Sequence, residues 1–498
     1  MPRHARPVGL PLTLEHSDAP LRHRIADSVI ALLSSGHLRP GDTLPASRAL
    51  AAELSVSRNA VLAAYDELAA AGFIHAAAGA STVVSQGADL AARAGVASHV
   101  AQRLPAPDSR PAMPAAPRWN LLPGYPDTAL ISTAAWRAAW RAAAAEPVGN
   151  GLPWSDNTEA LQEALAVHLR RTRGVTAAPA EIILAPGVSA ALRALAAAAG
   201  LAGRPVAFEE PGYPEGRQAL AQSGALIRPV PVDGDGLDPA ALADGDAAVY
   251  TTPAHQYPLG ARLSAPRRAT LIRWARQAGA LVIEDDFDGE FRYDVRGLPA
   301  LHSLGRGGPG GRFPPVGRGG PGGRFPPEDG QDVVAYVGTA SKILSPGLRI
   351  AWVVAPPHLR GPLREALGAC DESVSIPAAQ AVAHFISSGS LTRHLARAAR
   401  TYAARRHALI TALAAAAPAL AVSGVDAGLH LVAGLPAGTG ERALRDRLAQ
   451  AGLAVNVLSD YTTVSNTREA LVCGYALLPE TQAAAAAAVI AAQLAGRG

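Results

Sequence analysis

Along the first 86 residues, the pattern of apolar and polar positions predicts three helices followed by a small ribbon of strands. Within 22–34 the apolar residues follow helical spacing, at Ile25, Val29, Ile30 and Leu33. Ser47 and Ser57 are placed to cap a short second helix and a longer third one. The third helix is expected to bury one face, made of Val61, Leu62, Tyr65 and Leu68. Since 74–84 then resembles two short strands joined at Gly79, this unit is predicted to be a winged helix-turn-helix.

Beyond residue 117 the pattern changes to short apolar runs that alternate with longer stretches rich in alanine and leucine. The runs have the length and composition of strands, and they lie at 181–185, 205–208, 247–252, 280–284, 333–337 and 350–354. Strands that alternate with helices predict an α/β domain with a mainly parallel sheet covered by helices. Residues 87–117 are rich in Ala, Pro and Ser without a sustained apolar period, so they are interpreted as a linker.

Composition narrows the class of protein. A chain of 498 residues is too long for one ordinary core, and an apolar content of 49% is typical of a globular protein. The two cysteines, Cys370 and Cys473, have no metal-ligand spacing, so no metal site is predicted and a reducing cytoplasm is the expected location. The N-terminus has no apolar signal core, and the run 483–495 is too short to span a bilayer. A formal net charge of +4 says little about partners.

One residue differs chemically from the rest, because Lys342 is the only lysine among 45 lysine and arginine residues. A guanidinium stays protonated and cannot form an imine, whereas a buried lysine amine can lose its proton and add to an aldehyde. Lys342 is therefore predicted to be a Schiff-base lysine, although one lysine could also survive by chance in an arginine-biased composition. The hydroxyls of Thr339 and Ser341 and the planar guanidinium of Arg349 would suit a phosphate.

The stretch from 339 to 349, Thr-Ala-Ser-Lys-Ile-Leu-Ser-Pro-Gly-Leu-Arg, resembles the S/T-x-S-K-x-x-x-x-G-x-R element of fold type I aminotransferases. These proteins depend on pyridoxal 5'-phosphate (PLP). The resemblance implies an aldimine at Lys342, with Thr339, Ser341 and Arg349 around the cofactor phosphate. It also implies a fold type I large domain with a smaller C-terminal α+β subdomain, here at about 375–498.

Loops at strand ends supply further candidates for the cofactor site. After the strand near 182–185, Gly187 opens a helix whose first residues, Val188 and Ser189, are placed to bind a phosphate. This loop resembles the family's G-x-x-x-A-L phosphate loop. Tyr213 resembles the aromatic residue near the cofactor ring. His255 lies in a loop that resembles the one before the ring-binding strand, and it is interpreted as structural.

Five carboxylates lie within seven positions, at 284, 285, 286, 288 and 290. PLP needs a carboxylate opposite its pyridine nitrogen, because a protonated ring is the better electron sink. Asp285 is predicted to be that partner, with Asp286 as the alternative, since the run follows a strand and should lie at the carboxyl edge of the sheet. The same run could instead be a solvated loop.

The N-terminal unit contains two motifs that resemble GntR-type regulators, Leu38-Arg39-Pro40-Gly41-Asp42-Thr43-Leu44-Pro45-Ala46-Ser47-Arg48 and Val56-Ser57-Arg58-Asn59. In that geometry the N-terminal turn of the third helix enters the major groove. Ser57, Arg58 and Asn59 are therefore expected at base edges, and Arg39 and Arg48 at phosphates. Residues 1–88 contain seven arginines and seven acidic residues, so the prediction depends on placement and not on net charge.

Two features of these segments leave alternatives open. The wing, 76–81, lacks the family's arginine and Gly-Ser-Gly turn, so its DNA contacts are in doubt, and a winged helix that binds only protein is the alternative. Between the acidic run and Lys342, the segment 305–315 recurs unchanged as 317–327. A Gly/Pro/Arg tract of this kind cannot bury a core, so an insertion at about 305–328 is expected to be a disordered surface loop, with a DNA-contacting loop as the alternative.

Both halves together resemble the MocR subgroup of GntR-type regulators, with a winged helix at 1–86, a linker at 87–117 and an aminotransferase-like domain at 118–498. The resemblance implies a homodimeric, PLP-binding transcription factor that binds double-stranded DNA. It further implies that the large domain senses an amine, an amino acid or PLP itself. Such a protein is expected in the cytoplasm, associated with the nucleoid through its DNA binding and without a membrane partner.

Three positions depart from the pattern of the related enzymes. Phe287 replaces a tyrosine that donates to the phenolic oxygen of the cofactor, and Leu152 occupies the register of a tyrosine that reaches the phosphate of the other subunit's cofactor. Val472 stands where an arginine binds the substrate carboxylate, with Arg468 as the nearest substitute. These departures argue against efficient transamination, although they leave the cofactor residues in place. An aminotransferase that carries a winged helix is the alternative function.

Overall fold

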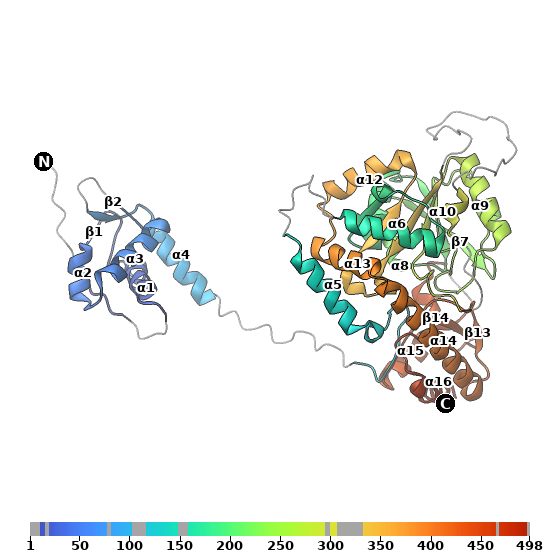
Figure 1. Ribbon diagram of the computed structural model, residues 1–498. Helices are drawn as coiled ribbons and strands as arrows, with labels where there is room; N and C mark the ends of the chain where they lie inside the picture. The colour runs from blue at the N-terminus through green and yellow to red at the C-terminus, as the bar shows by residue number, and fades with distance from the viewer. Residues whose placement is uncertain are drawn as a thin grey trace. The chain divides into compact units, whose positions relative to one another are not determined.

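The computed structural model describes residues 10–14, 19–76, 81–101, 116–147, 158–293, 299–305, 332–464 and 468–495. The chain divides into two compact units, Met1–Ala115 and Ala116–Gly498, whose elements are labelled in Figure 1. Among the described helices, none has the length and apolar character needed to cross a membrane. Leu152, the wing tip at 77–80, the segment 102–115 and nearly all of the repeated insertion lie outside the described residues.

The first unit is a winged helix-turn-helix, as predicted. Its helices are α1 (Leu21–Ser34), α2 (Ser47–Glu53) and α3 (Arg58–Ala70), and its sheet contains β1 (Thr43–Leu44), β3 (Thr82–Val84) and β2 (Ile74–Ala76), in that order and antiparallel. The core of this unit contains Ile25, Val29, Leu33, Leu50, Val61 and Leu68.

Two local predictions in this unit were wrong. Leu62 is exposed, because the buried face of α3 runs through residues 61, 64, 65 and 68, and Leu62 lies one residue off that stripe. Ser47 is the first helical residue of α2 and does not cap it, since the N-cap is Ala46, which makes no side-chain hydrogen bond.

A helix occupies part of the segment that the sequence suggested was a linker. Residues Ala88–Ala101 form α4, which packs against α1, and Ala88 and Ala92 are buried in the same core. Alanine has the highest helix propensity, and the spacing of these two residues places them on one face. The composition was interpreted as linker because a stripe of small alanines gives a weaker apolar signal than one of leucines.

The second unit is built on an eight-stranded mixed sheet in the order β5-β12-β11-β10-β9-β6-β7-β8. Its strands are β5 (Ile182–Ala185), β6 (Pro205–Glu210), β7 (Leu226–Asp233), β8 (Gly236–Leu237), β9 (Ala248–Thr251), β10 (Leu281–Asp285), β11 (Val334–Thr339) and β12 (Ala351–Val354). The five strands from β11 to β7 are parallel, whereas β12 runs antiparallel to both of its neighbours. The predicted strands are confirmed, and β7 and β8 were not foreseen.

Helices cover both faces of this sheet, as Figure 1 shows. On one face α7 (Val188–Ala198), α8 (Pro214–Gln222) and α12 (Pro357–Ala369) share a core with alternate strand residues. The other face is covered by α6 (Glu159–Arg173), α9 (Ala265–Ala278), α10 (Leu301–Gly305) and α13 (Ile376–Ser387), and α5 (Thr133–Ala145) packs on α13. The α/β architecture therefore brings the carboxyl ends of the parallel strands to one edge.

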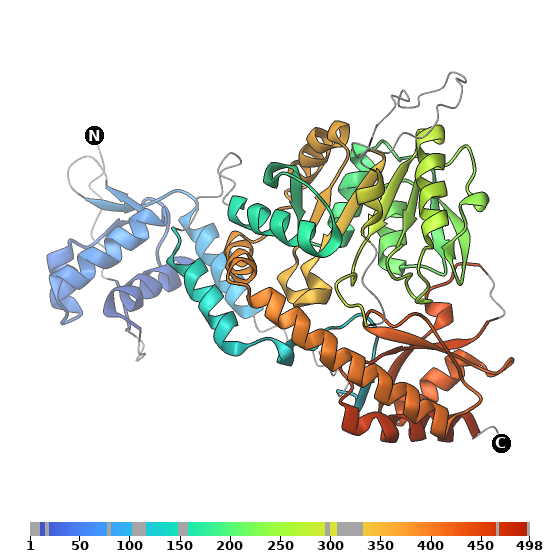
Figure 2. The ribbon, with the colours of Figure 1, turned by 45° about the vertical axis from the view of Figure 1, so that its right-hand side comes forward.

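A second sheet of five strands lies at the C-terminal end, in the order β13-β14-β16-β15-β4. Its members are β13 (Ala421–Ser423), β14 (His430–Gly434), β15 (Leu453–Val457), β16 (Ala470–Gly474) and β4 (Trp119–Leu121). Around it lie α14 (Ser390–Ala416), α15 (Glu441–Gln450) and α16 (Ala483–Ala495), drawn in orange and red in Figure 2. This smaller subdomain thus takes β4 from the start of the unit, while α13 packs on α5 and α6 of the larger part.

Candidate functional site

Lys342 lies at the carboxyl edge of the large sheet, on the four-residue helix α11 (Ala340–Ile343) that directly follows β11. Its Nζ donates a hydrogen bond to the carbonyl oxygen of Gly124 at 2.8 Å. Loss of hydration lowers the pKa of the Lys342 amine, and the carboxylates of Glu215 and Asp285 oppose that shift only in part. A lysine whose pKa is lowered in this way has more of the neutral amine that adds to an aldehyde.

Asp285 is the last residue of β10, next to β11 in the sheet, and it is buried. Its Oδ2 accepts a hydrogen bond from the Tyr250 hydroxyl at 2.6 Å, whereas its Oδ1 is buried without a partner among the described residues. Burial raises the pKa of Asp285 to about 7, and the charge of Asp286 adds to that rise. A buried acceptor without a partner is costly, so this oxygen is suited to a donor such as a protonated ring nitrogen.

Asp286 is held quite differently from its neighbour. The guanidinium of Arg173 binds it in a two-pronged ion pair, with Nε at 2.5 Å and Nη2 at 3.0 Å, and the Tyr336 hydroxyl donates a third hydrogen bond at 2.9 Å. Both oxygens of Asp286 are therefore already engaged. Between the two candidates for the ring partner, the geometry favours Asp285.

The predicted phosphate residues meet at the N-terminus of α7. Gly187, the N-cap of that helix, has φ of 107°, and a Cβ atom there would lie 3.0 Å from Nη2 of Arg349. The backbone of Arg349 is in the left-handed region, with φ of 52°. A non-glycine residue keeps this conformation only where its surroundings fix it. Val188 and Ser189 form the first turn of α7, whose free N–H groups favour an anion.

The two hydroxyls predicted near the phosphate are in different environments. Thr339 is buried, and its Oγ1 accepts from the backbone N–H of Ser341 at 3.1 Å and donates to the carbonyl of Ile350 at 3.2 Å. It therefore caps α11 and fixes the position of the lysine that follows. Ser341 is half-buried on the first turn of the same helix.

Tyr213 is the N-cap of α8, and its ring meets that of Tyr257 edge to face at 6.1 Å. Burial raises the pKa of Tyr213, Glu215 and Asp285 add to the rise, and Arg349 opposes it, so this ring lies among the charged groups of the site.

The sequence analysis did not predict two residues of this site, Tyr250 and Gly124. A tyrosine in the strand β9 was a visible signal for the first, but no local signal indicates a contact with Gly124, which lies 218 residues before Lys342.

These residues fit the cofactor that the lysine motif implies. The lysine amine with its lowered pKa suits an aldehyde. The buried carboxylate oxygen of Asp285, which has no partner among the described residues, suits a protonated ring nitrogen. Gly187 lies close to Arg349 at a helix N-terminus, and this arrangement suits a phosphate. The site lies at the carboxyl ends of β10 and β11 and next to the N-terminus of α7, where open α/β sheets bind ligands.

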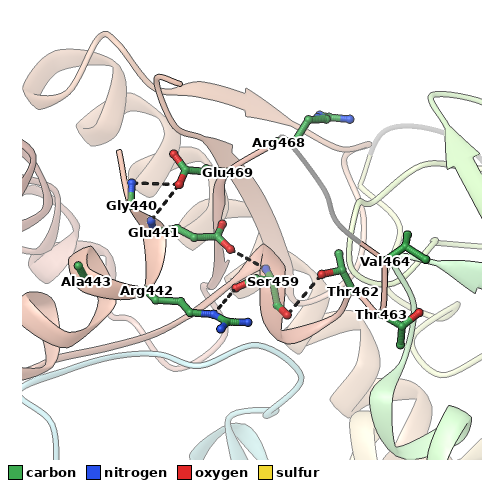
Figure 3. Close-up of a pocket in the computed structure, with 10 residues that line it drawn as sticks. All are labelled: Gly440, Glu441, Arg442, Ala443, Ser459, Thr462, Thr463, Val464, Arg468 and Glu469. Atoms are coloured by element: carbon green, nitrogen blue, oxygen red, sulfur yellow. Dashed lines mark hydrogen bonds between the residues drawn. The ribbon is translucent and has the colours of Figure 1, made fainter. Parts of the chain in front are cut away.

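The residues that depart from the enzyme pattern are also placed. Phe287 is buried against Tyr257, with ring centroids 5.5 Å apart. Val472 is buried within β16, opposite Val432. Arg468 instead lines a cavity of about 470 Å³ in the smaller subdomain, shown in Figure 3, whose lining includes none of the predicted cofactor residues. In that cavity Glu469 accepts from the backbone N–H of Gly440, and Arg442 donates to Ser459.

All five residues predicted to bind DNA are exposed. Ser57 is the N-cap of α3, and its Oγ accepts from the backbone N–H of Ala60 at 3.2 Å. Arg58 and Asn59 begin the helix itself, and Nε of Arg58 lies 3.5 Å from Oγ of Ser47 on α2. Arg39 lies before α2, and Arg48 lies within it. The five residues therefore belong to the helix-turn-helix and to the segment that leads into it.

Comparison with known proteins supports both units. The family model for bacterial regulatory proteins of the gntR family matches residues 21–84, and the one for aminotransferase class I and II matches residues 123–490. The HTH-type pyridoxine biosynthesis transcriptional regulator PdxR of Corynebacterium glutamicum is 32% identical over 94% of this chain and 94% of its own. The probable rhizopine catabolism regulatory protein MocR of Rhizobium meliloti is 31% identical over 92% of this chain and 91% of its own.

Solved structures support the fold of the second unit. An archaeal alanine:glyoxylate aminotransferase has a TM-score of 0.67 at 22% identity, covering 76% of this chain and 91% of the other. The fold and site thus define a GntR-type helix-turn-helix joined to an aminotransferase class I and II domain. The PdxR and MocR regulators match this chain over nearly their whole length. The chain therefore belongs to the MocR-type GntR transcriptional regulators.

Proposed function

We propose that this protein is a PLP-dependent transcriptional regulator, in which PLP or an amine bound at Lys342 changes the affinity of the winged helix for DNA. The observation that carries the proposal is the coexistence of two intact sites in one chain. The exposed N-terminal turn of α3 supports DNA recognition, and the group of Lys342, Asp285 and Arg349 supports cofactor binding.

Each residue has a role that follows from its place. PLP supplies an aldehyde and a ring that withdraws electrons. Lys342 would bind it covalently, Asp285 would accept a hydrogen bond from its ring nitrogen, and Arg349 with the N-terminus of α7 would hold its phosphate. Tyr250 would not contact the cofactor through this bond but would position the carboxylate of Asp285, because its hydroxyl donates a hydrogen bond to that carboxylate. A structural neighbour, the α-aminoadipate aminotransferase LysN of Thermus thermophilus, was solved with N-(5'-phosphopyridoxyl)-L-leucine at 23% identity and a TM-score of 0.62.

The alternative, an aminotransferase that carries a winged helix, is less well supported. The curated relatives matched over 92% or more of the chain are named as regulators, whereas the 2-aminoadipate transaminase of Thermus thermophilus matches only 47% of it. Phe287 cannot donate to a phenolic oxygen, and Val472 cannot pair with a substrate carboxylate. Losing a paired arginine typically costs a few kcal/mol of carboxylate recognition.

The effector is proposed only as a chemical class. A primary amine, an amino acid or PLP would each react or compete at the amine of Lys342. One relative is named for pyridoxine biosynthesis and another for rhizopine catabolism, so the regulators of this family differ in the pathway they serve. The name of the first relative makes PLP itself the first effector to test.

The experiment measures DNA binding and chemistry side by side. A DNA site is selected from a random pool with the full chain, and its affinity is measured by fluorescence anisotropy with and without PLP. We expect PLP to change the affinity at least fivefold, and amino acids to change the absorbance of the bound cofactor without sustained turnover. Many turnovers with an amino acid, together with a DNA affinity that ignores PLP, would favour the enzyme instead.

We also propose that the second unit forms a homodimer, because the related active sites are completed at a subunit interface and GntR-type half-sites are read in pairs. Light scattering of the PLP-bound protein should give twice the mass of 50.9 kDa calculated for one chain. A PLP-bound monomer would contradict this proposal while leaving the cofactor assignment intact.

A further inference from the structure

Three buried side chains from distant segments converge next to the cofactor residues. His255 lies in the loop after β9, Asp288 in the loop after β10, and His430 is the first residue of β14 in the smaller subdomain. One ligand atom from each, a ring nitrogen or a carboxylate oxygen, lies within 4.8 Å of the others. The two imidazole rings are 5.0 Å apart between centroids and tilted by 40°.

The hydrogen bonds of the two histidines leave one nitrogen of each ring free. Nδ1 of His255 lies 2.9 Å from Oδ2 of Asp288, and Nε2 of His430 lies 2.8 Å from the carbonyl oxygen of Pro258. A carboxylate and a carbonyl only accept, so both of these nitrogens carry the proton. Nε2 of His255 and Nδ1 of His430 therefore present lone pairs, and both are buried without a partner among the described residues.

A buried polar atom without a hydrogen-bond partner costs roughly 1–3 kcal/mol. Each of these two nitrogens is therefore suited to a ligand that accepts its lone pair. Because Nε2 of His430 donates to the carbonyl oxygen of Pro258, Nδ1 of the neutral ring carries no proton. Neutral imidazole is the form that binds a metal ion.

The backbone of Gly428 lies close against the His255–Asp288 pair. A Cβ atom at Gly428 would lie 2.2 Å from Cε1 of His255 and 2.4 Å from Oδ2 of Asp288, and Gly428 has φ of 72°. Only glycine allows the chain to approach the His255–Asp288 pair this closely. The histidine ring is thereby fixed from two sides, by the carboxylate and by the backbone.

We propose that Nε2 of His255 and Nδ1 of His430 bind a divalent first-row transition ion of the zinc class, with Asp288 as the outer carboxylate that orients His255. Imidazole nitrogens suit zinc, nickel and copper ions, and a metal-binding histidine characteristically donates its other N–H to a carboxylate or a backbone carbonyl. Both histidines have that second bond here. The carboxylate also offsets part of the ionic charge. The proposal does not depend on PLP and stands or fails separately from the regulatory function.

The test uses the full chain, freed of PLP and metals, because PLP itself chelates divalent ions. Zn²⁺ binding is measured by competition with a chromophoric chelator and by metal analysis after gel filtration. We expect one Zn²⁺ per chain in addition to any weak surface binding, and His255→Gln and His430→Gln each to weaken it at least tenfold. Asp288→Asn should weaken it 10- to 100-fold, as loss of an outer carboxylate does. His384→Gln, a half-buried histidine outside the cluster, is the matched control and should bind as the wild type does.

Two outcomes would overturn the proposal: wild-type protein that takes up no Zn²⁺, Ni²⁺ or Co²⁺ at micromolar concentration, or cluster variants that bind as tightly as the His384 control. Should a histidine variant fail to fold, the wild type still decides the question with Co²⁺. Intense visible absorption bands from low-symmetry nitrogen coordination are expected, and the pale spectrum of hexahydrated Co²⁺ would count against the site. Circular dichroism of each variant checks the fold.

Discussion

At the scale of single residues, three consecutive carboxylates at the end of β10 have three different roles. Glu284 accepts from two backbone N–H groups at the start of α10, Asp285 accepts from Tyr250 at the proposed cofactor site, and Asp286 binds Arg173. Side chains alternate along a strand, so residues 284 and 286 share one face and 285 has the other. The sequence predicted the acidic edge but not this division, because the partners lie 17, 35 and 113 residues away.

The raised pKa of Asp285 predicts a pH-dependent cost in the cofactor-free protein. Burial raises this pKa from 3.8 to about 7, so between those values the folded chain keeps a proton that the unfolded chain releases. Stability therefore falls as pH rises through that window. Asp285→Asn, which never ionises, should exceed the wild type by roughly 2 to 4 kcal/mol in the free energy of unfolding at pH 8, and by almost nothing near pH 4. Thermal unfolding from pH 4 to pH 8 measures the difference.

The same substitution should weaken PLP binding by roughly 1.5–3 kcal/mol, because it removes a charged acceptor for the ring nitrogen. Absorbance titration with PLP measures this loss. Asp286→Asn is the comparison, and it should destabilise the fold by about 3–5 kcal/mol at neutral pH because it leaves Arg173 buried without its charged partner. A difference between Asp285→Asn and the wild type that does not vary with pH would contradict the assignment of a buried acid.

At the scale of elements, short helices are positioned by the residues at their ends. Thr339 caps α11 and fixes Lys342, and Ser57 caps α3 and fixes the turn that would enter the major groove. The cap of α3 was predictable, because serine before an apolar helical stripe is a local signal. The N-cap of α2 was mispredicted because an alanine takes that place, and alanine gives no signal of its own.

Substitutions at two neighbouring residues, Ser57 and Arg58, should have different effects on stability and on DNA binding. Ser57→Ala removes the acceptor for the N–H of Ala60 and should cost about 1 kcal/mol of stability of the first unit, whereas Ser57→Asn should retain most of it. Arg58→Ala should leave stability nearly unchanged but weaken specific DNA binding by roughly 1 to 3 kcal/mol. Thermal unfolding and fluorescence anisotropy measure the two effects. Unchanged DNA affinity of Arg58→Ala at moderate salt would contradict the placement of α3 in the groove.

Helix α4 should stabilise the winged helix although it lies beyond that motif. Ala88 and Ala92 are buried in the core that α1 shares, so their removal would expose apolar surface on α1. We expect a fragment that ends at residue 101 to unfold at a higher temperature than one that ends at residue 86. Ala92→Asp in the longer fragment, which places a charge at a fully buried position, is expected to abolish the gain. Equal unfolding temperatures for the two fragments would show that α4 contributes nothing.

At the scale of the whole molecule, the sequence predicted those strands that have a local apolar signal. It could not predict which distant strands pair with each other. The six apolar runs became β5, β6, β9, β10, β11 and β12. The parallel pairing of β4 with β15 joins residues more than 300 positions apart, and it draws Gly124 toward Lys342. No periodicity within either segment encodes that contact. For the same reason, the convergence of His255, Asp288 and His430 is visible only in three dimensions.

Because the two sites belong to separate units, single substitutions should separate the functions of the molecule. Arg58→Ala should weaken specific DNA binding and keep the visible absorbance of bound PLP. Lys342→Ala should lose that absorbance and the cofactor trapped by borohydride, since no other lysine exists in the chain to replace it. It should keep the DNA affinity of the PLP-free wild type, because no residue of the first unit is changed, and that affinity should no longer respond to PLP.

The response itself should require one continuous chain. A mixture of fragment 1–101, which contains the helices of the first unit, and fragment 116–498, which contains the proposed cofactor residues, should bind DNA and PLP independently. Its DNA affinity, measured by anisotropy at fixed salt, is expected to stay constant as PLP is added, whereas that of the full chain changes. The salt has to be fixed because phosphate contacts alone make DNA affinity strongly salt-dependent. If the DNA affinity of the Lys342→Ala chain responded to PLP as that of the wild type does, the signal would not start at this lysine. If the fragment mixture responded in the same way, the signal would not need the two units to be joined in one chain.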